Sequence, residues 1–402
     1  MRTRTMKLAF ATAACAYLAL AALPTDAIPV FPRKYGFNCI MCHSSYPRLN
    51  DYGIRYRQNG YQLPGRENDE KTVLESPAPF AMRITGGLTV DQFRNTAGSQ
   101  DIDQFQLNGL DILSGGLMGR SIGYFMVYPP QIAQSRGVAG QTGTLEMGNV
   151  IFSNLAGTWL NVRGGRFEPA YDAFSVKRRL SFSPYEIYDF PGASGLVMAD
   201  TQTGVELTGY GRCGWKYAAG WINGSSNPNT NPGDSPVDFY VRGVKVFGHG
   251  EGQTAGQRIG LTGYVGQARP AAGARQGFSR FGVDASFNYS VCNLAIQYLQ
   301  GVDNQALAGA GGDFDFSGGF AELNYLPTTS TVGFARYDWV NSPANAALQL
   351  SDITRWTIGG RYYFVDNVAL HLEYSRRRQC SFTPGLGDAT EAFFTTALDF
   401  AF

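Results

Sequence analysis

Residues 355–364 have the sequence RWTIGGRYYF, in which two kinds of side chain alternate. The even positions are apolar or aromatic apart from one glycine: Trp356, Ile358, Gly360, Tyr362 and Phe364. The odd positions are largely polar: Arg355, Thr357, Gly359, Arg361 and Tyr363. Because successive side chains of a β-strand point to opposite faces of a sheet, the stretch predicts a strand with one apolar face and one polar face.

The same alternation recurs through residues 80–402, for example at 281–289, at 368–375 and in the last stretch, which ends on Phe402. From this pattern we expect about sixteen strands of roughly ten residues, the length that a tilted membrane strand requires. We place their starts near residues 81, 102, 118, 147, 157, 199, 213, 237, 258, 280, 292, 314, 330, 354, 368 and 391, and the segment near 147 has the weakest pattern.

The connections between these segments also alternate. We expect short turns after the even segments, for example at 114–116 and 365–367, and longer connections after the odd ones, for example at 94–101 and 168–198. Short turns on one side and long loops on the other are typical of outer-membrane barrels. The predicted fold class is therefore all-β, a barrel of about sixteen strands surrounded by lipid in the outer membrane of a Gram-negative cell.

The first 27 residues have the features of a secretory signal. A basic start (Arg2, Arg4 and Lys7) precedes an apolar run at 8–23 and a plausible cleavage site at 25–27. The whole chain carries a formal net charge of +1, so its composition indicates no nucleic-acid partner. No nucleophile–base set or phosphate-binding loop stands out, and we predict no catalytic residues.

Residues 39–43 form the pattern Cys-x-x-Cys-His. Two thiols at this spacing can each form a thioether to a vinyl group of one haem, and the adjacent histidine can then bind the iron. We therefore predict one covalent haem c, with Cys39 and Cys42 as attachment residues and His43 as an axial ligand. Attachment of this haem takes place outside the cytoplasm, which agrees with the signal. The alternative is a redox or disulfide pair between the two cysteines.

The motif belongs to a short region, 28–79, that we predict to be a small domain followed by a linker. We expect a helix that begins at Ser45, Tyr46 and Pro47 and stops at Gly60. About fifty residues bury too little apolar surface to fold firmly alone, and a covalent haem would supply the missing core. The predicted organisation is a signal at 1–27, a monohaem cytochrome c domain at 28–79 and a barrel at 80–402.

Residues 31–64 resemble the fused cytochrome–porin family of outer-membrane iron oxidases, through the motif and the downstream residues Tyr46-Pro47-Arg48-Leu49-Asn50, Gly53 and Asn59-Gly60-Tyr61. The resemblance implies an electron conduit that takes electrons from an extracellular donor, Fe(II) in that family. It also implies a periplasmic carrier, such as a c-type cytochrome, as the partner, and an Fe(II):cytochrome c oxidoreductase activity.

The second axial ligand stays open. Met82, at the start of the first strand, is one candidate, because thioether ligation would raise the potential; it could equally be an apolar residue at the membrane boundary. His371 is expected on the lumenal face of its strand, His249 in a periplasmic turn, and Met41 points the wrong way between the two cysteines.

Two further features bear on function. Four carboxylates of the connection 168–198 could attract a ferrous ion: Glu168, Asp172, Glu186 and Asp189. The alternatives are that this loop is solvated or folds in to narrow the pore. We expect the small domain to pack against inward-facing side chains of the barrel: Arg355, Arg361, His371 and Glu373. Two rival functions remain: a passive diffusion porin with a disulfide-bonded plug, and the same conduit delivering electrons outward.

Overall fold

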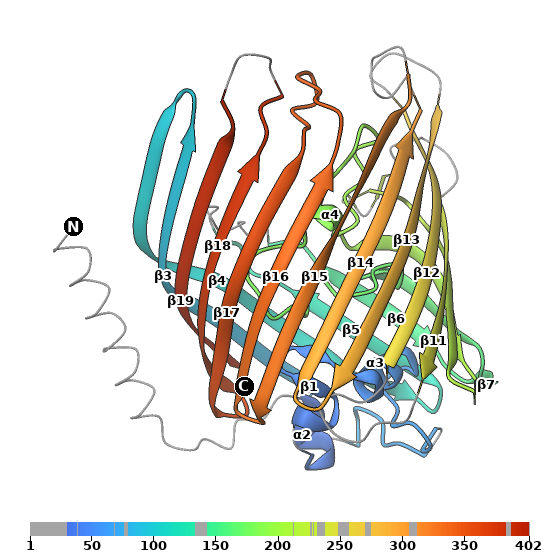
Figure 1. Ribbon diagram of the computed structural model, residues 1–402. Helices are drawn as coiled ribbons and strands as arrows, with labels where there is room; N and C mark the ends of the chain where they lie inside the picture. Colours follow the sequence, from blue (N-terminus) through green and yellow to red (C-terminus); the bar gives the residue numbers. More distant parts are fainter. Residues whose placement is uncertain are drawn as a thin grey trace.

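Sixteen antiparallel strands close into a single barrel in the computed structural model (Figure 1). The structure describes residues 30–37, 39–67, 69–75, 79–132, 143–211, 213–225, 227, 229–230, 238–247, 257–269, 275–304, 312–382 and 387–401. The predicted signal and His249 lie outside these residues. No helix among them is long and apolar enough to cross a membrane. The predicted fold class is confirmed.

Each barrel strand pairs with its neighbours along the chain, and the last strand closes onto the first. The barrel strands are β3 (Phe80–Asn95), β4 (Gly98–Gly119), β5 (Ile122–Tyr128), β6 (Met147–Phe152), β8 (Asn161–Phe167), β9 (Gln202–Tyr210), β10 (Trp215–Ile222), β11 (Asp238–Phe247), β12 (Gln257–Ala268), β13 (Gln276–Tyr289), β14 (Cys292–Asp303), β15 (Phe314–Thr328), β16 (Thr331–Asn341), β17 (Ile353–Val365), β18 (Val368–Gln379) and β19 (Ala389–Ala401). A short strand, β7 (Leu155–Thr158), lies in the connection between β6 and β8, outside the closed ring.

The two faces of β17 confirm the alternation that predicted the barrel. Trp356 is 64% exposed on the outer surface, whereas Arg361, five positions on, is 3% exposed in the lumen. An outer surface of apolar and aromatic side chains fits lipid, and a polar lumen is what a membrane barrel encloses.

Two predicted connections were wrong. The segment 94–101 is not a long loop, because β3 and β4 continue as a hairpin in which Asn95 pairs with Gly98. The predicted turn at 114–116 lies inside β4, which pairs with β5 from Ile112 as far as Gly119. Strand pairing depends on backbone hydrogen bonds, so it continues through polar residues where the apolar alternation no longer marks a strand.

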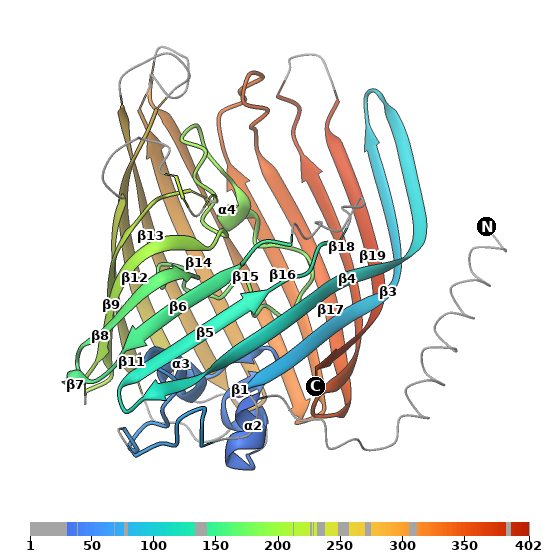
Figure 2. The same cartoon turned by 180° about the vertical axis from the view of Figure 1, so that it is seen from behind.

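The N-terminal segment, residues 30–75 with Asn38 and residue 68 outside the description, lies at the mouth of the barrel where β19 ends (Figure 1; Figure 2 from behind). It contains α2 (Val30–Tyr35), a 3-10 turn η1 (Cys39–Met41), β1 (His43–Ser45), β2 (Arg48–Leu49) and α3 (Asp51–Gln58). The predicted helix start was wrong, because 43–49 forms a small hairpin and α3 begins after the N-cap Asn50. The predicted stop at Gly60 is supported by its φ of 67°, which favours glycine.

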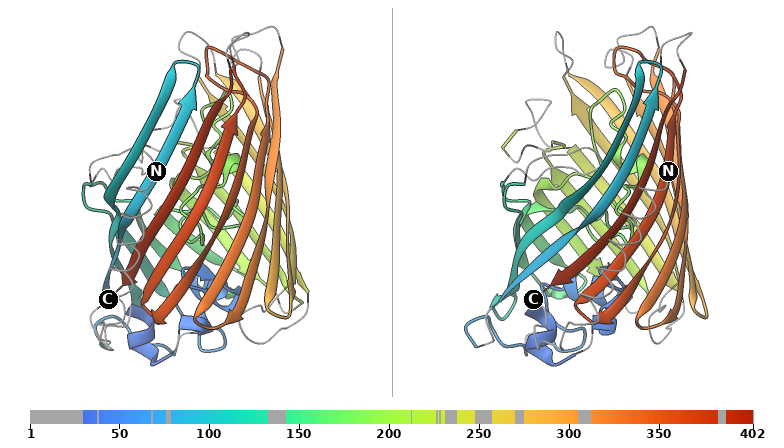
Figure 3. Two further views of the ribbon diagram at one scale, coloured as in Figure 1. Left: turned by 60° about the vertical axis from the view of Figure 1, so that its left-hand side comes forward. Right: turned by 90° about the vertical axis from the view of Figure 1, so that its left-hand side faces the viewer.

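A second segment fills the lumen. We call residues 168–201, between β8 and β9, the lumenal loop; its short helix α4 (Glu186–Asp189) lies inside the barrel (Figure 1; Figure 3). Its apolar side chains are buried against the inner faces of strands from β10 to β17, including Tyr171, Tyr185 and Tyr188 from the loop and Tyr240, Tyr264 and Phe320 from the wall.

Candidate cofactor site

A cavity of about 220 Å³ lies between the N-terminal segment and the barrel wall. Cys39, Cys42 and His43, the three residues of the motif, all line it. Its other walls are mainly apolar and come from both sides, including Phe31, Tyr56 and Leu63 from the N-terminal segment and Leu113, Phe125 and Met147 from the barrel. The fold therefore encloses the motif in a mainly apolar chamber between the N-terminal segment and the barrel wall.

His43 is held in a defined orientation by the hairpin that follows the motif. Its Nδ1 lies 3.1 Å from the carbonyl oxygen of Pro47, which lies in the turn between β1 and β2. An N–H on Nδ1 that donates to this carbonyl leaves Nε2 as the free nitrogen, the arrangement usual for metal-binding histidines. Burial lowers the pKa of His43 to about 4, so the ring is neutral, the form that binds a metal.

The two cysteines lie close together at the turn η1. The amide of Cys42 donates to the carbonyl of Cys39 at 3.2 Å, and both thiols are free. Burial raises the pKa of both thiols to about 11. A thiol that exchanges disulfides rapidly needs a lowered pKa.

Asn50 and Gly53 join the motif to α3. The Asn50 side chain accepts from the amide of Gly53 at 2.9 Å and donates to the carbonyl of Met41 at 3.0 Å, so it caps the helix and holds the motif together. A Cβ at Gly53 would overlap the carbonyl oxygen of Cys42. Both residues carried the family resemblance, but no role for either could be assigned from the sequence.

The barrel side of the cavity is formed by the inward faces of β3 to β6. Phe125 of β5 stacks on Tyr61, with ring centroids 5.5 Å apart. A Cβ at Gly123 would overlap the backbone of Gly60, so the N-terminal segment lies directly against β5. The Gln62 side chain, buried at this contact, donates to the Ser153 hydroxyl at 2.7 Å.

The edge of the cavity carries charges of both signs, because the carboxylates Asp111 and Glu146 lie there beside the cations. Four of its lining residues are cations: Arg57, Arg83, Lys177 and Arg178. Arg57 and Arg178 share one carboxylate, that of Glu168, at 3.2 and 2.6 Å. Two guanidinium groups on a single carboxylate leave a positive excess. The two propionates of a haem are acidic groups that this edge would suit.

The candidates that the sequence predicted for the second axial ligand do not all lie at the cavity that the motif lines. Met82 does not line the cavity, although its neighbours Ala81 and Arg83 on β3 do. His371 is buried in the lumen, where its Nε2 lies 3.1 Å from Glu373 Oε2. Met41 lines the cavity on the same side as the cysteines. The residue that sequence analysis missed is Met147, which lines the cavity from β6.

The inward-facing residues expected to meet the small domain contact the lumenal loop instead, which corrects that prediction. Arg361 donates to the Leu180 carbonyl at 2.8 Å, and Glu373 accepts from the Ser183 amide, also at 2.8 Å. The physical reason is that backbone groups of the lumenal loop already satisfy these side chains.

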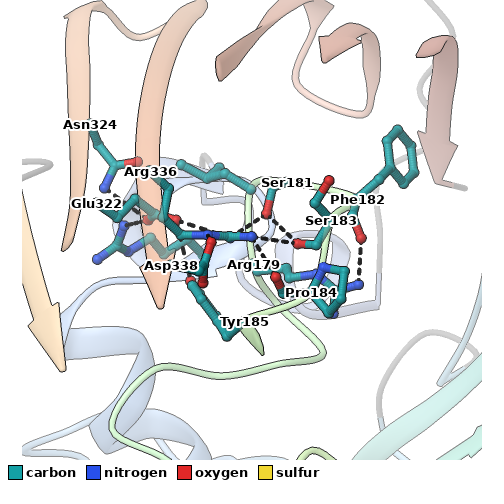
Figure 4. Close-up of polar contacts among 12 residues, drawn as sticks. Arg179, Ser181, Phe182, Ser183, Pro184, Tyr185, Glu322, Asn324, Arg336 and Asp338 are labelled. Atoms are coloured by element: carbon teal, nitrogen blue, oxygen red, sulfur yellow. Dashed lines mark hydrogen bonds and ion pairs between the residues drawn. The ribbon is translucent and has the colours of Figure 1, made fainter. Parts of the chain in front are cut away.

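The centre of this contact is Arg336 on β16, which is 1% exposed (Figure 4). Its Nε lies 2.7 Å from Asp338 Oδ2. Its two terminal nitrogens donate to the Ser181 hydroxyl at 2.6 Å and to the Pro184 carbonyl at 2.6 Å. A charged side chain of the wall is thus satisfied by the backbone and hydroxyls of the loop.

Two of the four carboxylates that the sequence singled out in the loop are paired with arginines, whereas both oxygens of Asp172 are buried without a hydrogen-bond partner among the residues that the structure describes. Glu168 pairs with arginines as described above, and Glu186 is bound by Arg355 and Arg377 at 2.5 and 3.2 Å. Within the described part of the chain, no three histidine, cysteine or acidic side chains gather in a metal-binding group.

Solved structures of outer-membrane porins superpose on the barrel. The anion-selective porin from Comamonas acidovorans superposes with a TM-score of 0.55 at 14% identity, over 80% of this chain and 99% of that one. The channel DcaP of Acinetobacter baumannii gives a TM-score of 0.56 at 12% identity, over 81% and 99%. No protein-family model and no curated protein sequence matches the chain. At these identities the likeness shows the fold, an outer-membrane barrel.

Proposed function

We propose that the protein is an outer-membrane electron conduit, a cytochrome–porin fusion that carries one covalent haem c at the mouth of its barrel. Cys39 and Cys42 would hold the haem, and His43 would bind its iron. The observation that supports this most is that the three motif residues line one apolar cavity, with His43 fixed through Nδ1 so that Nε2 is free. When bound, such a haem accepts and releases single electrons.

The residues around the cavity have separate tasks in this proposal. The apolar rings of Phe31, Tyr61 and Phe125 keep water away, which favours a stable potential. The cations at the edge balance the acidic groups of the haem. The extracellular donor, Fe(II) by the family resemblance, and the periplasmic carrier, such as a c-type cytochrome, would exchange electrons through this one centre.

Orientation follows from the same proposal. Tight turns such as the one joining Tyr289 to Cys292 belong on the periplasmic side of such a barrel. We therefore place the N-terminal segment at the periplasmic mouth, where the carrier can reach it. A tag inserted near Asn229 should be accessible on intact cells, and labelling only after the outer membrane is opened would reverse this orientation.

A passive diffusion porin is the second candidate, favoured by the porin folds that superpose on the barrel. In that case Cys39 and Cys42 would close a disulfide in a plug. A barrel of this strand number leaves an aqueous channel unless something fills it. Here the N-terminal segment lies at one mouth and the lumenal loop lies in the interior, so either function predicts a low conductance for the intact protein.

The two functions are separated by one reconstitution. Full-length protein is inserted into liposomes that contain an oxidised c-type cytochrome, and Fe(II) is added outside. The conduit predicts reduction of the trapped cytochrome with little ion conductance, and the matched Cys42→Ala protein should give no reduction. No reduction by the wild-type protein would favour the porin. Trapping Fe(II) inside and the oxidised acceptor outside tests the outward direction.

A further inference from the structure

We propose that Met147 is the second axial ligand of the haem, an inference that rests on the proposed function. Met147 is the first residue of β6, is 3% exposed and lines the same cavity as Cys39, Cys42 and His43. Its neighbours in the buried cluster are apolar, among them Phe125, Val127 and Ile151. The thioether sulfur is thus a soft, neutral ligand inside an apolar chamber.

Met147 and His43 line the cavity from different parts of the chain. His43 belongs to the N-terminal segment, whereas Met147 belongs to the barrel wall, where it pairs in register with Val127 of β5. The cavity lies between these two parts. A group seated there could therefore be bound by His43 from the segment and by Met147 from the wall.

The other donors that line the cavity are less suited. Lys177 is a salt-bridged cation, 2.7 Å from Glu146, and must lose a proton before it can bind iron. The Tyr56 hydroxyl bonds to that of Tyr35 at 3.4 Å, and burial raises the pKa of Tyr56 well above 10. Tyr46 lies in the same hairpin as His43, with ring centroids 5.3 Å apart, so it lines the cavity from the same part of the chain. A methionine sulfur can bind iron without first losing a proton or breaking an ion pair or hydrogen bond.

Ligation by Met147 would also join the two parts of the protein. His43 and the thioethers bind the haem to the N-terminal segment, and Met147 would bind the same iron to β6. The segment would then be held in the barrel mouth by a metal bond in addition to apolar contact. A histidine–methionine pair also raises the reduction potential relative to other ligand pairs.

The test uses purified full-length holoprotein with Met147→Leu, Met147→His and, as the matched control, Met82→Leu, which removes a sulfur from β3 off the cavity. We expect wild type and Met82→Leu to show the sulfur-to-iron charge-transfer band of the ferric protein. Met147→Leu should lose this band, have a lower reduction potential and bind carbon monoxide when reduced. Met147→His should restore six-coordinate low-spin iron without the band, which shows that the site still folds.

The outcomes distinguish this inference from the proposed function. Haem staining after denaturing electrophoresis should be equal in all four proteins. Equal staining with an unchanged band in Met147→Leu, or loss of the band in Met82→Leu, overturns the assignment of Met147 and leaves the conduit standing. A wild-type protein without covalent haem, made in cells with active haem-attachment machinery, overturns both.

Discussion

The N-terminal segment lies at the mouth of the barrel and the lumenal loop lies inside it, and their contacts with the wall differ. The segment packs on β3 to β6 through apolar rings and leaves a cavity of about 220 Å³ there, although Arg48 and Asp51 also join it to β15 and β10 by ion pairs. The loop is bound to β13 to β18 by ion pairs and hydrogen bonds centred on buried groups such as Arg336 and Glu373. In the contact between the lumenal loop and the wall, protein atoms alone satisfy these buried polar groups.

The contact between the N-terminal segment and the barrel wall, in contrast, leaves room for a ligand. Left unfilled, an apolar cavity of this volume would cost on the order of 5 kcal/mol. A segment of about fifty residues has little stability from which to offset that cost. The comparison indicates that the loop is a permanent plug, whereas the segment is a plug whose seating depends on what the cavity holds.

The largest expected effect concerns conductance. Deleting residues 28–79 should abolish electron transfer but raise single-channel conductance only slightly, because the lumenal loop stays in place. Removing residues 172–198 as well should open the barrel and raise conductance at least tenfold over the single deletion. Planar-bilayer recording measures both. A fully open channel after the first deletion alone would show that the loop is not a plug.

The polar contact between the lumenal loop and the barrel wall should be lost when Arg336 is substituted. Arg336→Ala leaves Asp338 and the carbonyls of the loop without their partner, and removing one member of a buried ion pair costs about 3–5 kcal/mol. The urea midpoint in detergent should fall accordingly, with the haem content unchanged. The matched control is Arg378→Ala, whose pair with Asp388 is exposed and should leave the midpoint where it was.

Acid should loosen the tie between the two plugs, which Glu168 of the lumenal loop makes to Arg57 of the N-terminal segment; Arg178 of the loop binds the same carboxylate. Burial favours the neutral acid, but the two arginines hold the pKa of Glu168 down at about 2, against 4.5 ordinarily. The carboxylate therefore stabilises the fold above pH 4.5, and about 3 kcal/mol is lost as the pH falls from 4.5 to 2. The free energy of unfolding of the wild type should fall between pH 4.5 and pH 2 for this reason, and the Glu168→Gln variant should lack this part of the pH dependence.

The smallest expected effect tests how closely α3 must approach the motif. Gly53→Ala places a methyl group against the Cys42 carbonyl, and overpacking of this kind costs about 1–3 kcal/mol. Haem incorporation per chain should fall while the barrel stays folded. Gly109→Ala on β4, where a Cβ meets nothing within 4 Å, is the control and should incorporate haem normally.

The sequence predicts the barrel well because alternation such as that of 355–364 is a local consequence of having lipid on one face. It also predicts the motif, whose chemistry depends on spacing alone. It does not predict Met147, which begins a strand with a weak pattern and reaches the motif only when the barrel closes. Nor does it predict the lumenal contact, because Arg336 is satisfied by backbone carbonyls, which any sequence carries.

The central claim is that the cavity at the barrel mouth holds one covalently attached haem, and the most direct measurement is haem content after denaturation. Protein made in cells with active haem-attachment machinery is denatured, separated by electrophoresis and stained for haem, with the haem per chain measured from the pyridine haemochrome spectrum. The claim predicts one haem per chain in the wild type, retained in Met147→Leu and lost or greatly reduced in Cys39→Ala and Cys42→Ala. A wild-type protein without haem, whose Cys39 and Cys42 form a disulfide, would contradict it and favour the porin.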